Sequence, residues 1–201
     1  IHHKLPICLS HLSDLVKSAK ISNNYDDLLF ATIMSCCFYV CHQSGELIQK
    51  SRSKKDWRKI IKRCSLNFSS GYAGYHLPYH KTDPFFHGTN ILFTHHDVAD
   101  PVDLLHQYVM RQDHLHGAHS PLFITEDSSY PSRSWFNLKL FLFVDCSFGW
   151  HSACVEGATY YTGLGISKNV IMAIGRWSSS AWRMYIHDDP CVRVALELAD
   201  L

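Results

Sequence analysis

The chain has 201 residues, of which 46% are hydrophobic, and its formal net charge is +1. This length and composition allow one substantial hydrophobic core but not two ordinary domains joined by a linker, so we expect a single domain over residues 1–201. The near-zero charge argues against a strongly basic nucleic-acid-binding protein. No apolar run reaches the roughly 18 to 20 residues that a membrane-spanning helix requires, so we expect no membrane association.

The first predicted element is a buried helix over residues 26–40. Asn23 or Asn24 can cap its start, because a short polar side chain accepts a hydrogen bond from a free backbone N–H. Asp26 and Asp27 favour the first turn, where the positive end of the helix dipole lies. The rest of the segment is apolar.

Three short extended segments follow, at residues 64–68, 74–79 and 89–93. Serine, glycine, aspartate and proline between them are typical of turns. We expect these segments to form a small antiparallel sheet.

The next segments alternate between helix and loop. Pro101 begins a predicted helix over residues 101–110, since proline is favoured at the first helical position. The histidine-rich segment 111–120 is interpreted as a loop that leads to a short extended piece at 121–124. Residues 132–144 form another predicted helix, whose apolar side chains lie nearly all round and predict deep burial.

The C-terminal part is expected to be helical. A helix over residues 152–163 would end at glycine, Ser167 would cap a helix over 168–174, and a last helix would cover 178–186. The predicted fold class is therefore mainly α with a small antiparallel β-sheet, an α+β fold.

Eight cysteines are present, and none forms a Cys-x-x-Cys pair. Three of them lie in the apolar stretch 36–41, where free cysteine behaves as a small hydrophobic residue. The start of the chain lacks the basic and apolar regions of a signal peptide. We expect reduced thiols in an intracellular protein, with a secreted disulfide framework as the alternative. The cysteines are Cys8, Cys36, Cys37, Cys41, Cys64, Cys146, Cys154 and Cys191.

A local basic segment lies between Lys50 and Arg63. It contains eight basic residues against one acid, Asp56, so it is a candidate for phosphate contacts; a solvated charged loop is the alternative. The candidate DNA-binding residues are Lys54, Lys55, Arg58 and Lys59 from this segment, together with Arg176.

One ordered motif carries chemistry in the C-terminal half. It consists of His151, Cys154, Trp177 within Gly-Arg-Trp-Ser-Ser (residues 175–179), and Tyr185. The motif resembles the C-terminal signature of the tyrosine recombinases, in which a His-x-x-Arg pair, a His or Trp, and a nucleophilic Tyr surround one DNA phosphate.

Upstream segments extend this resemblance over roughly residues 5 to 190. They are similar in order and spacing to segments of the DNA breaking-rejoining enzymes of fungal mobile elements. Each is weakly specific alone, but their joint order is specific and implies the catalytic-domain fold of a tyrosine recombinase or integrase. The segments are residues 43–47, Lys-Thr-Asp-Pro at 81–84, Pro-Leu-Phe at 121–123 and Arg-Ser-Trp-Phe at 133–136.

The resemblance implies roles for four residues and requires no cofactor. Tyr185 would attack the DNA phosphorus to give a 3′-phosphotyrosyl link, and Lys81 would protonate the departing 5′ oxygen. His151 would hydrogen-bond a non-bridging oxygen or assist the tyrosine proton, and Trp177 would donate its indole N–H to the phosphate. Taken singly, each is more often a packing or solvated residue.

Two positions depart from the family pattern. Gln43, three residues before Glu46, stands where the first arginine is expected, and Cys154 stands where the second is expected. The family's arginines give permanently charged, bidentate contacts that no neutral side chain reproduces. Removing one such donor ordinarily lowers the rate on the order of 10²- to 10³-fold. We therefore expect a degenerate domain that keeps the fold and loses strand cleavage.

Three functions stay open at this point. The first is the degenerate domain, which would bind double-stranded DNA in the nucleus without cutting it. The second is an active recombinase that uses Tyr185 with substitute charge from His42 or Arg176. The third is a protein-interaction module that forms homo-oligomers through the apolar tail, residues 191–201. The N-terminal DNA-clamping domain that such enzymes generally carry is expected to be absent from this chain.

Fifteen histidines raise the question of a metal site. They are dense at His95-His96 and at His114, His116 and His119, but neither cluster has a nearby cysteine. Zinc sites usually combine histidine with cysteine or carboxylate ligands at short defined spacings. We therefore expect solvent-exposed loop histidines and no metal.

Overall fold

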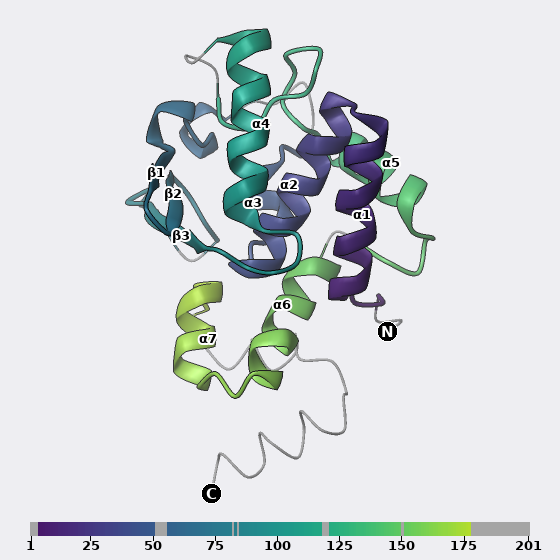
Figure 1. Ribbon diagram of the computed structural model, residues 1–201. Coiled ribbons are helices and arrows are strands. Elements are labelled where there is room, and N and C mark those ends of the chain that lie inside the picture. The colour runs from purple at the N-terminus through teal and green to yellow at the C-terminus, as the bar shows by residue number, and fades with distance from the viewer. Residues whose placement is uncertain are drawn as a thin grey trace, which may run out of the picture.

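The computed structural model describes residues 4–50, 56–81, 83, 85–117, 121–149 and 151–177. Within these ranges the chain is mainly helical and carries a sheet of three strands (Figure 1). The predicted fold class is confirmed. The elements are α1 (Leu9–Ser22), α2 (Tyr25–Tyr39), α3 (Ser44–Leu47), the 3-10 helices η1 (Trp57–Lys59) and η2 (Arg63–Ser65), β1 (Asn67–Ser69), β2 (Tyr72–Leu77), β3 (Thr89–Thr94), α4 (Pro101–His116), α5 (Arg133–Phe143), α6 (Ser152–Gly163) and α7 (Lys168–Gly175).

Helix α2 is the centre of the core. It contacts α1, α4 and α6, and every residue from Leu28 to Tyr39 is buried. Its start is capped as expected, since the Asn24 side chain accepts a hydrogen bond from the Asp27 backbone N–H at 3.1 Å. The predicted helix over residues 26–40 is confirmed to within one residue at each end.

The sheet is antiparallel in the order β1-β2-β3, with Tyr75 of β2 opposite Ile91 of β3. Its inner face buries Ala73, Tyr75 and Leu77 against the helices. The predicted meander is confirmed, but its first strand was placed too early, because residues 63–65 form η2. The loop from 78 to 88 joins β2 to β3 and carries Lys81.

Helix α6 crosses α2 at very short range. A side chain at Gly157 would place its Cβ only 2.0 Å from the Phe38 carbonyl oxygen, so glycine is required for the two backbones to approach. Helix α6 has the predicted bounds, and α7 follows Ser167 as expected. The close crossing brings the first turn of α6, with Cys154, against the end of α2.

Two predictions were wrong. Residues 111–116 continue α4 instead of forming a loop; Gln112 is fully buried there, and its side-chain amide donates to the Pro121 carbonyl at 2.6 Å. Helix α5 is not buried all round, because Leu138 and Leu142 are 61% and 75% exposed. Its buried residues, Trp135, Phe136 and Leu140, occupy one face.

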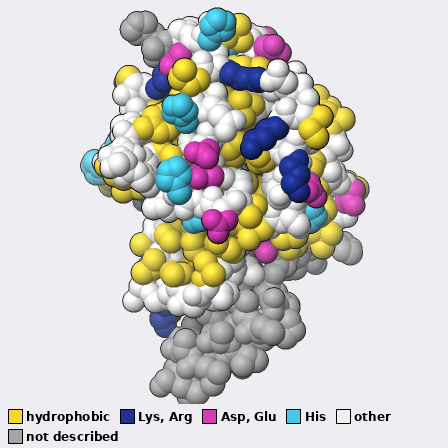
Figure 2. Space-filling view, viewed as in Figure 1, with side chains coloured by type: hydrophobic (Ala, Val, Ile, Leu, Met, Phe, Trp, Pro, Cys, Tyr) yellow, Lys and Arg dark blue, Asp and Glu magenta, His cyan; other side chains and the backbone are white. Residues whose placement is uncertain are grey.

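Charges are mixed on the surface. On the face in Figure 2, Lys and Arg side chains lie among Asp, Glu and His side chains, consistent with a net charge of +1. The lower part of this face, over α7, is rich in hydrophobic side chains, and Leu164, Ile166 and Val170 are the large exposed ones in that segment. No helix of the described chain is long and apolar enough to cross a membrane.

Candidate functional site

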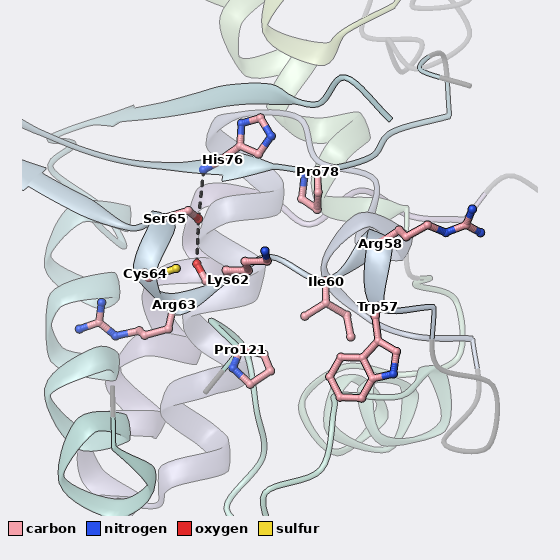
Figure 3. Close-up of a pocket in the computed structure, with 10 residues that line it drawn as sticks. All are labelled: Trp57, Arg58, Ile60, Lys62, Arg63, Cys64, Ser65, His76, Pro78 and Pro121. Atoms are coloured by element: carbon pink, nitrogen blue, oxygen red, sulfur yellow. Dashed lines mark hydrogen bonds between the residues drawn. The ribbon is translucent and has the colours of Figure 1, made fainter. Parts of the chain in front are cut away.

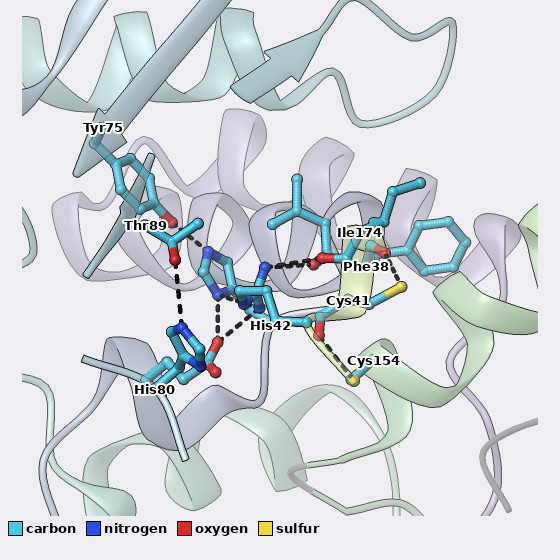
Figure 4. Close-up of polar contacts among 11 residues, drawn as sticks. Phe38, Cys41, His42, Tyr75, His80, Thr89, Cys154 and Ile174 are labelled. Carbon is cyan, nitrogen blue, oxygen red and sulfur yellow. Dashed lines mark hydrogen bonds and ion pairs between the residues drawn. The ribbon is translucent and has the colours of Figure 1, made fainter. Parts of the chain in front are cut away.

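A buried polar network beyond the end of α2 joins three distant parts of the sequence (Figure 4). His42 Nδ1 lies 2.5 Å from Glu46 Oε2 on α3, and His42 Nε2 lies 2.8 Å from the Tyr75 hydroxyl on β2. Arg176, which follows α7, donates from Nη2 to Glu46 Oε2 at 2.9 Å. The network therefore links α2, α3, the sheet and the C-terminal helices.

The protonation states in this network follow from burial. His42 is fully buried, and burial together with the Arg176 charge lowers its pKa to about 4, so its ring is neutral. Burial alone would raise the pKa of Glu46, but the hydrogen bond from His42 and the charge of Arg176 lower it below its usual value. The carboxylate and the guanidinium thus form an ion pair.

The His42 tautomer is fixed by its two partners. Glu46 Oε2 can only accept, so Nδ1 of His42 carries the proton and Nε2 accepts from the Tyr75 hydroxyl. Burial raises the pKa of Tyr75 well above its ordinary value, which keeps this hydroxyl a donor. Arg176 Nη2 lies 3.1 Å from the same Nδ1 but cannot donate to it while Nδ1 donates to Glu46.

Arg176 is an interior residue, although the sequence placed it among the candidate DNA contacts. Its side chain is 8% exposed. Nη1 donates to the carbonyls of Ile174 at 2.9 Å and Val40 at 3.3 Å. These contacts direct the guanidinium toward α2 and Glu46.

The two positions without arginine lie next to this network. Gln43 is the N-terminal cap residue of α3 and is half-buried. Cys154 is fully buried, and its Sγ donates to the Cys41 carbonyl at 3.1 Å. Burial raises the pKa of Cys154 well above its ordinary value, so the thiol stays protonated, and the charges of Glu46 and Arg176 are near enough to affect it.

Two positive charges from other elements act on His151, which immediately precedes α6. Burial lowers the pKa of His151, and the nearby charges of Arg133 and Lys81 lower it further. Arg133 is the first residue of α5, and its backbone N–H donates to the Gln49 carbonyl at 3.0 Å, which fixes it beside the segment that follows α3. No role was expected for Arg133, although it lies in the Arg-Ser-Trp-Phe segment that supports the resemblance.

Hydrogen bonds stabilise the loop that carries Lys81. Asp83 accepts hydrogen bonds from the backbone N–H groups of His87 at 3.2 Å and Gly88 at 2.7 Å. Gly88 has φ +72°, and a Cβ there would lie 2.7 Å from the Leu77 carbonyl oxygen. His80, beside Lys81, contacts the Thr89 hydroxyl at 3.3 Å (Figure 4).

The basic segment η1 packs on the same loop. The Arg58 guanidinium lies 4.6 Å from the centre of the Phe86 ring, and Lys59 Nζ lies 4.1 Å from the centre of the Tyr79 ring. Lys59 also lines a small recess together with Glu46. Of the candidate DNA contacts, these two are therefore adjacent to the loop that carries Lys81, while Lys54 and Lys55 lie outside the described residues.

Trp177 packs against the turn that precedes it. A Cβ at Gly175 would lie 2.5 Å from the Trp177 ring, so glycine makes room for the indole. Trp177 also packs against the small cluster of Cys41, Cys154, Ala158 and Ile171. Tyr185 and the tail 191–201 lie outside the described residues.

Among the residues that the structure describes, one group of side chains could hold a metal ion. His95, Asp100 and Asp103 place their ligand atoms within 4.8 Å of one another. His95 Nδ1 is, however, 2.6 Å from Asp100 Oδ2, and Asp100 Oδ1 caps α4 by accepting from Val102 N. A histidine–aspartate hydrogen bond and a helix cap account for these contacts.

The solved structures that share this fold include two complexes of one recombinase. The first is the site-specific recombinase XerH bound to difH substrate in a pre-cleavage complex, with a TM-score of 0.64 and 12% identity over 92% of this chain and 50% of that chain. The second is the post-cleavage complex of XerH with palindromic difH, with a TM-score of 0.65 and 13% identity over 99% of this chain and 53% of that chain.

The chain thus has the fold of a tyrosine recombinase catalytic domain, and it spans about half the length of the XerH chains that it matches. No family model matches the sequence, and no curated protein matches it.

Proposed function

We propose that this chain is a DNA-binding domain of the tyrosine recombinase type that does not cleave DNA. The proposal rests on the ion pair that Arg176 forms with the buried carboxylate of Glu46. This arginine was a candidate to replace the two that are missing, but its charge is compensated inside the protein. Gln43 and Cys154 offer no positive charge in its place.

Duplex binding is supported by the fold and by the basic side chains around Lys81. The XerH structures with the same fold are complexes with difH substrate. Arg58 and Lys59 of η1 pack on the β2–β3 loop that carries Lys81. The charges of Lys81 and of Arg133 on α5 both act on His151, at the start of α6. Contacts of this kind give salt-dependent affinity for the phosphate backbone without reading sequence.

The test uses duplexes that the protein itself selects from a random-sequence library. We expect the selected duplexes to bind with a strong salt dependence in a mobility-shift assay. When they carry a nick that traps cleavage products, no covalent protein–DNA adduct should appear on a denaturing gel. An adduct that forms with the unchanged protein and is lost in Tyr185→Phe would overturn the proposal.

A second candidate is an active recombinase in which Arg133 supplies the missing charge. The observation that favours it is the proximity of the Arg133 and Lys81 charges to His151, which lowers the pKa of that histidine. An arginine there could contact a phosphate oxygen beside the lysine expected to protonate the leaving oxygen. If an adduct forms, Arg133→Gln should abolish it, whereas Arg111→Gln should not, because Arg111 lies on α4 and donates to the Asn23 carbonyl.

A further inference from the structure

A large pocket lies outside the polar network, between the η1–η2 segment, the end of β2 and residue 121 (Figure 3). Its volume is about 730 Å³, within the range of roughly 300 to 1,000 Å³ that small-molecule sites occupy. We call it the η1–η2 pocket. Of the residues that line it, only Arg58 has a role above, as a candidate phosphate contact.

The walls of the η1–η2 pocket are fixed by backbone and side-chain hydrogen bonds. Lys62 pairs with Pro121 in an isolated β-bridge, and Leu122 N donates to the Ile61 carbonyl at 2.8 Å. Ser65 Oγ donates to the Lys62 carbonyl at 2.7 Å and accepts from His76 N at 3.3 Å (Figure 3). The pocket is thus formed before any ligand arrives.

The charge of the lining is one-sided. Among the residues that the structure describes, the lining contains Lys62, Arg58, Arg63 and His76 but no Asp or Glu. Arg63 is paired with Asp113 at 2.6 Å and Arg58 with Asp56 at 3.0 Å. Lys62 makes no ion pair with a residue that the structure describes. In Figure 3 its amine extends toward Ile60 and Pro78, whereas Arg58 and Arg63 extend outward. An anionic group on a ligand would therefore meet Lys62.

The remaining wall is apolar. Ile60, Pro78 and Pro121 line it, and Trp57 is 66% exposed at its edge. The Trp57 ring is held by an edge contact with Tyr130, at 5.8 Å between ring centres. An exposed, supported indole is a stacking platform for a planar ring, such as a nucleobase.

We propose that the η1–η2 pocket binds one nucleotide unit, with its base against Trp57 and the two prolines and its phosphate at Lys62. The pocket requires a planar apolar body that carries an anion, and this requirement does not depend on the proposed function. The choice of a nucleotide among such ligands does rest on the proposed binding of DNA. The unit could be a free mononucleotide or an unstacked nucleotide of a DNA strand.

The chain contains a built-in reporter for this site. Cys64 lines the η1–η2 pocket and is exposed, whereas Cys146 is exposed elsewhere. Alkylation by iodoacetamide, followed by peptide mass analysis, measures the rate at each thiol separately. We expect thymidine monophosphate or a ten-residue oligothymidylate to slow alkylation of Cys64 several-fold and to leave Cys146 unchanged.

Variants test the two halves of the pocket. Trp57→Leu should raise the probe concentration that protects Cys64 about tenfold through loss of stacking. Lys62→Gln should raise this concentration several-fold. Phe68→Leu on β1 and Lys20→Gln on α1 are matched controls that should leave it unchanged. Protection by the mononucleotide identifies a free ligand, and protection by the oligonucleotide alone identifies a strand.

Two results would overturn the inference. One is the absence of protection by either nucleotide probe, and the other is equal protection by inorganic phosphate, which would show an anion site only. Failure here is distinguishable from failure of the proposed function, because selected duplexes are tested separately by mobility shift. If the nucleotide probes do not protect Cys64 but selected duplexes still bind, only the proposal for the pocket is overturned.

Discussion

The Arg176–Glu46 ion pair brings two charges into the interior, where each depends on the other for compensation. Removing one partner of such a pair leaves an uncompensated buried charge, which typically costs about 3 to 5 kcal/mol. We therefore expect Arg176→Met to lower the free energy of unfolding by about that amount in urea. The double variant Arg176→Met with Glu46→Gln should be more stable than the single variant, since the introduced amide would bury no charge and could still accept from His42.

Arg58 provides the matched control for this measurement. It also pairs with a carboxylate, Asp56, but at the surface, where its side chain is 70% exposed. Arg58→Gln should change stability little, because exposed ion pairs are screened by solvent. Equal stability of the single and double interior variants would show that the charge pairing is not what stabilises the network.

His42 makes stability depend on pH in a defined direction. Its pKa falls from 6.5 in the unfolded chain to about 4 in the folded protein, so between these values the unfolded chain binds the additional proton. Stability should therefore decrease as the pH falls from about 6.5 toward 4, by roughly 3 kcal/mol in total from this residue. Urea unfolding at several pH values measures this loss of stability. His42→Asn should flatten the dependence, whereas His114→Asn on the exposed end of α4 should leave it unchanged.

At the scale of elements, the crossing of α2 and α6 places Cys154 and the His42 network together. Gly157 permits the crossing, since a Cβ would lie 2.0 Å from the Phe38 carbonyl oxygen. Gly157→Ala should lower the free energy of unfolding by about 1 to 3 kcal/mol or more, because two backbones must separate. Gly163→Ala, at the end of the same helix with open space around it, should be neutral or slightly stabilising. Similar losses for both variants would contradict the role of the crossing.

The elements that the sequence predicted well are those with strong local signals. Helix α2 has a capping asparagine, first-turn acids and an apolar interior, and α6 ends at glycine, so both were predicted to within a residue. Helix α5 shows the limit of such reasoning. Its apolar composition gave the correct helix but not the exposed face at Leu138 and Leu142, because burial depends on which neighbours a face meets.

The candidate site was predicted less completely, for a similar reason. Spacing along the chain identified Gln43 and Cys154 as positions without the expected arginine. It could not show that Arg176 turns inward to Glu46, since the two are 130 residues apart and only tertiary packing brings them together. The effect of the Arg133 charge on His151 was missed because the two residues lie at the starts of different helices, α5 and α6, which only tertiary packing brings near each other.

At the scale of the whole molecule, Gln43 and Cys154 differ in whether an arginine could take their place. Gln43 is half-buried at the start of α3, so an arginine there can reach solvent or a phosphate. Cys154 is fully buried near Arg176, so an arginine there would bring a second positive charge into the interior. We expect Cys154→Arg to be destabilised in urea and Gln43→Arg to fold normally.

Gln43→Arg should also change how the domain binds DNA, because Gln43 stands where the resemblance implies an arginine that contacts a DNA phosphate. One added phosphate contact makes the dependence of log K on log salt concentration steeper by about 0.9. Mobility shifts of a selected duplex at four salt concentrations measure this slope. Gln107→Arg, at an exposed position of α4, adds the same charge on another element and should leave the slope nearly unchanged. Equal slopes for both variants would show that the charge acts through the overall field of the protein, and that the α3 end of the domain does not contact the DNA backbone.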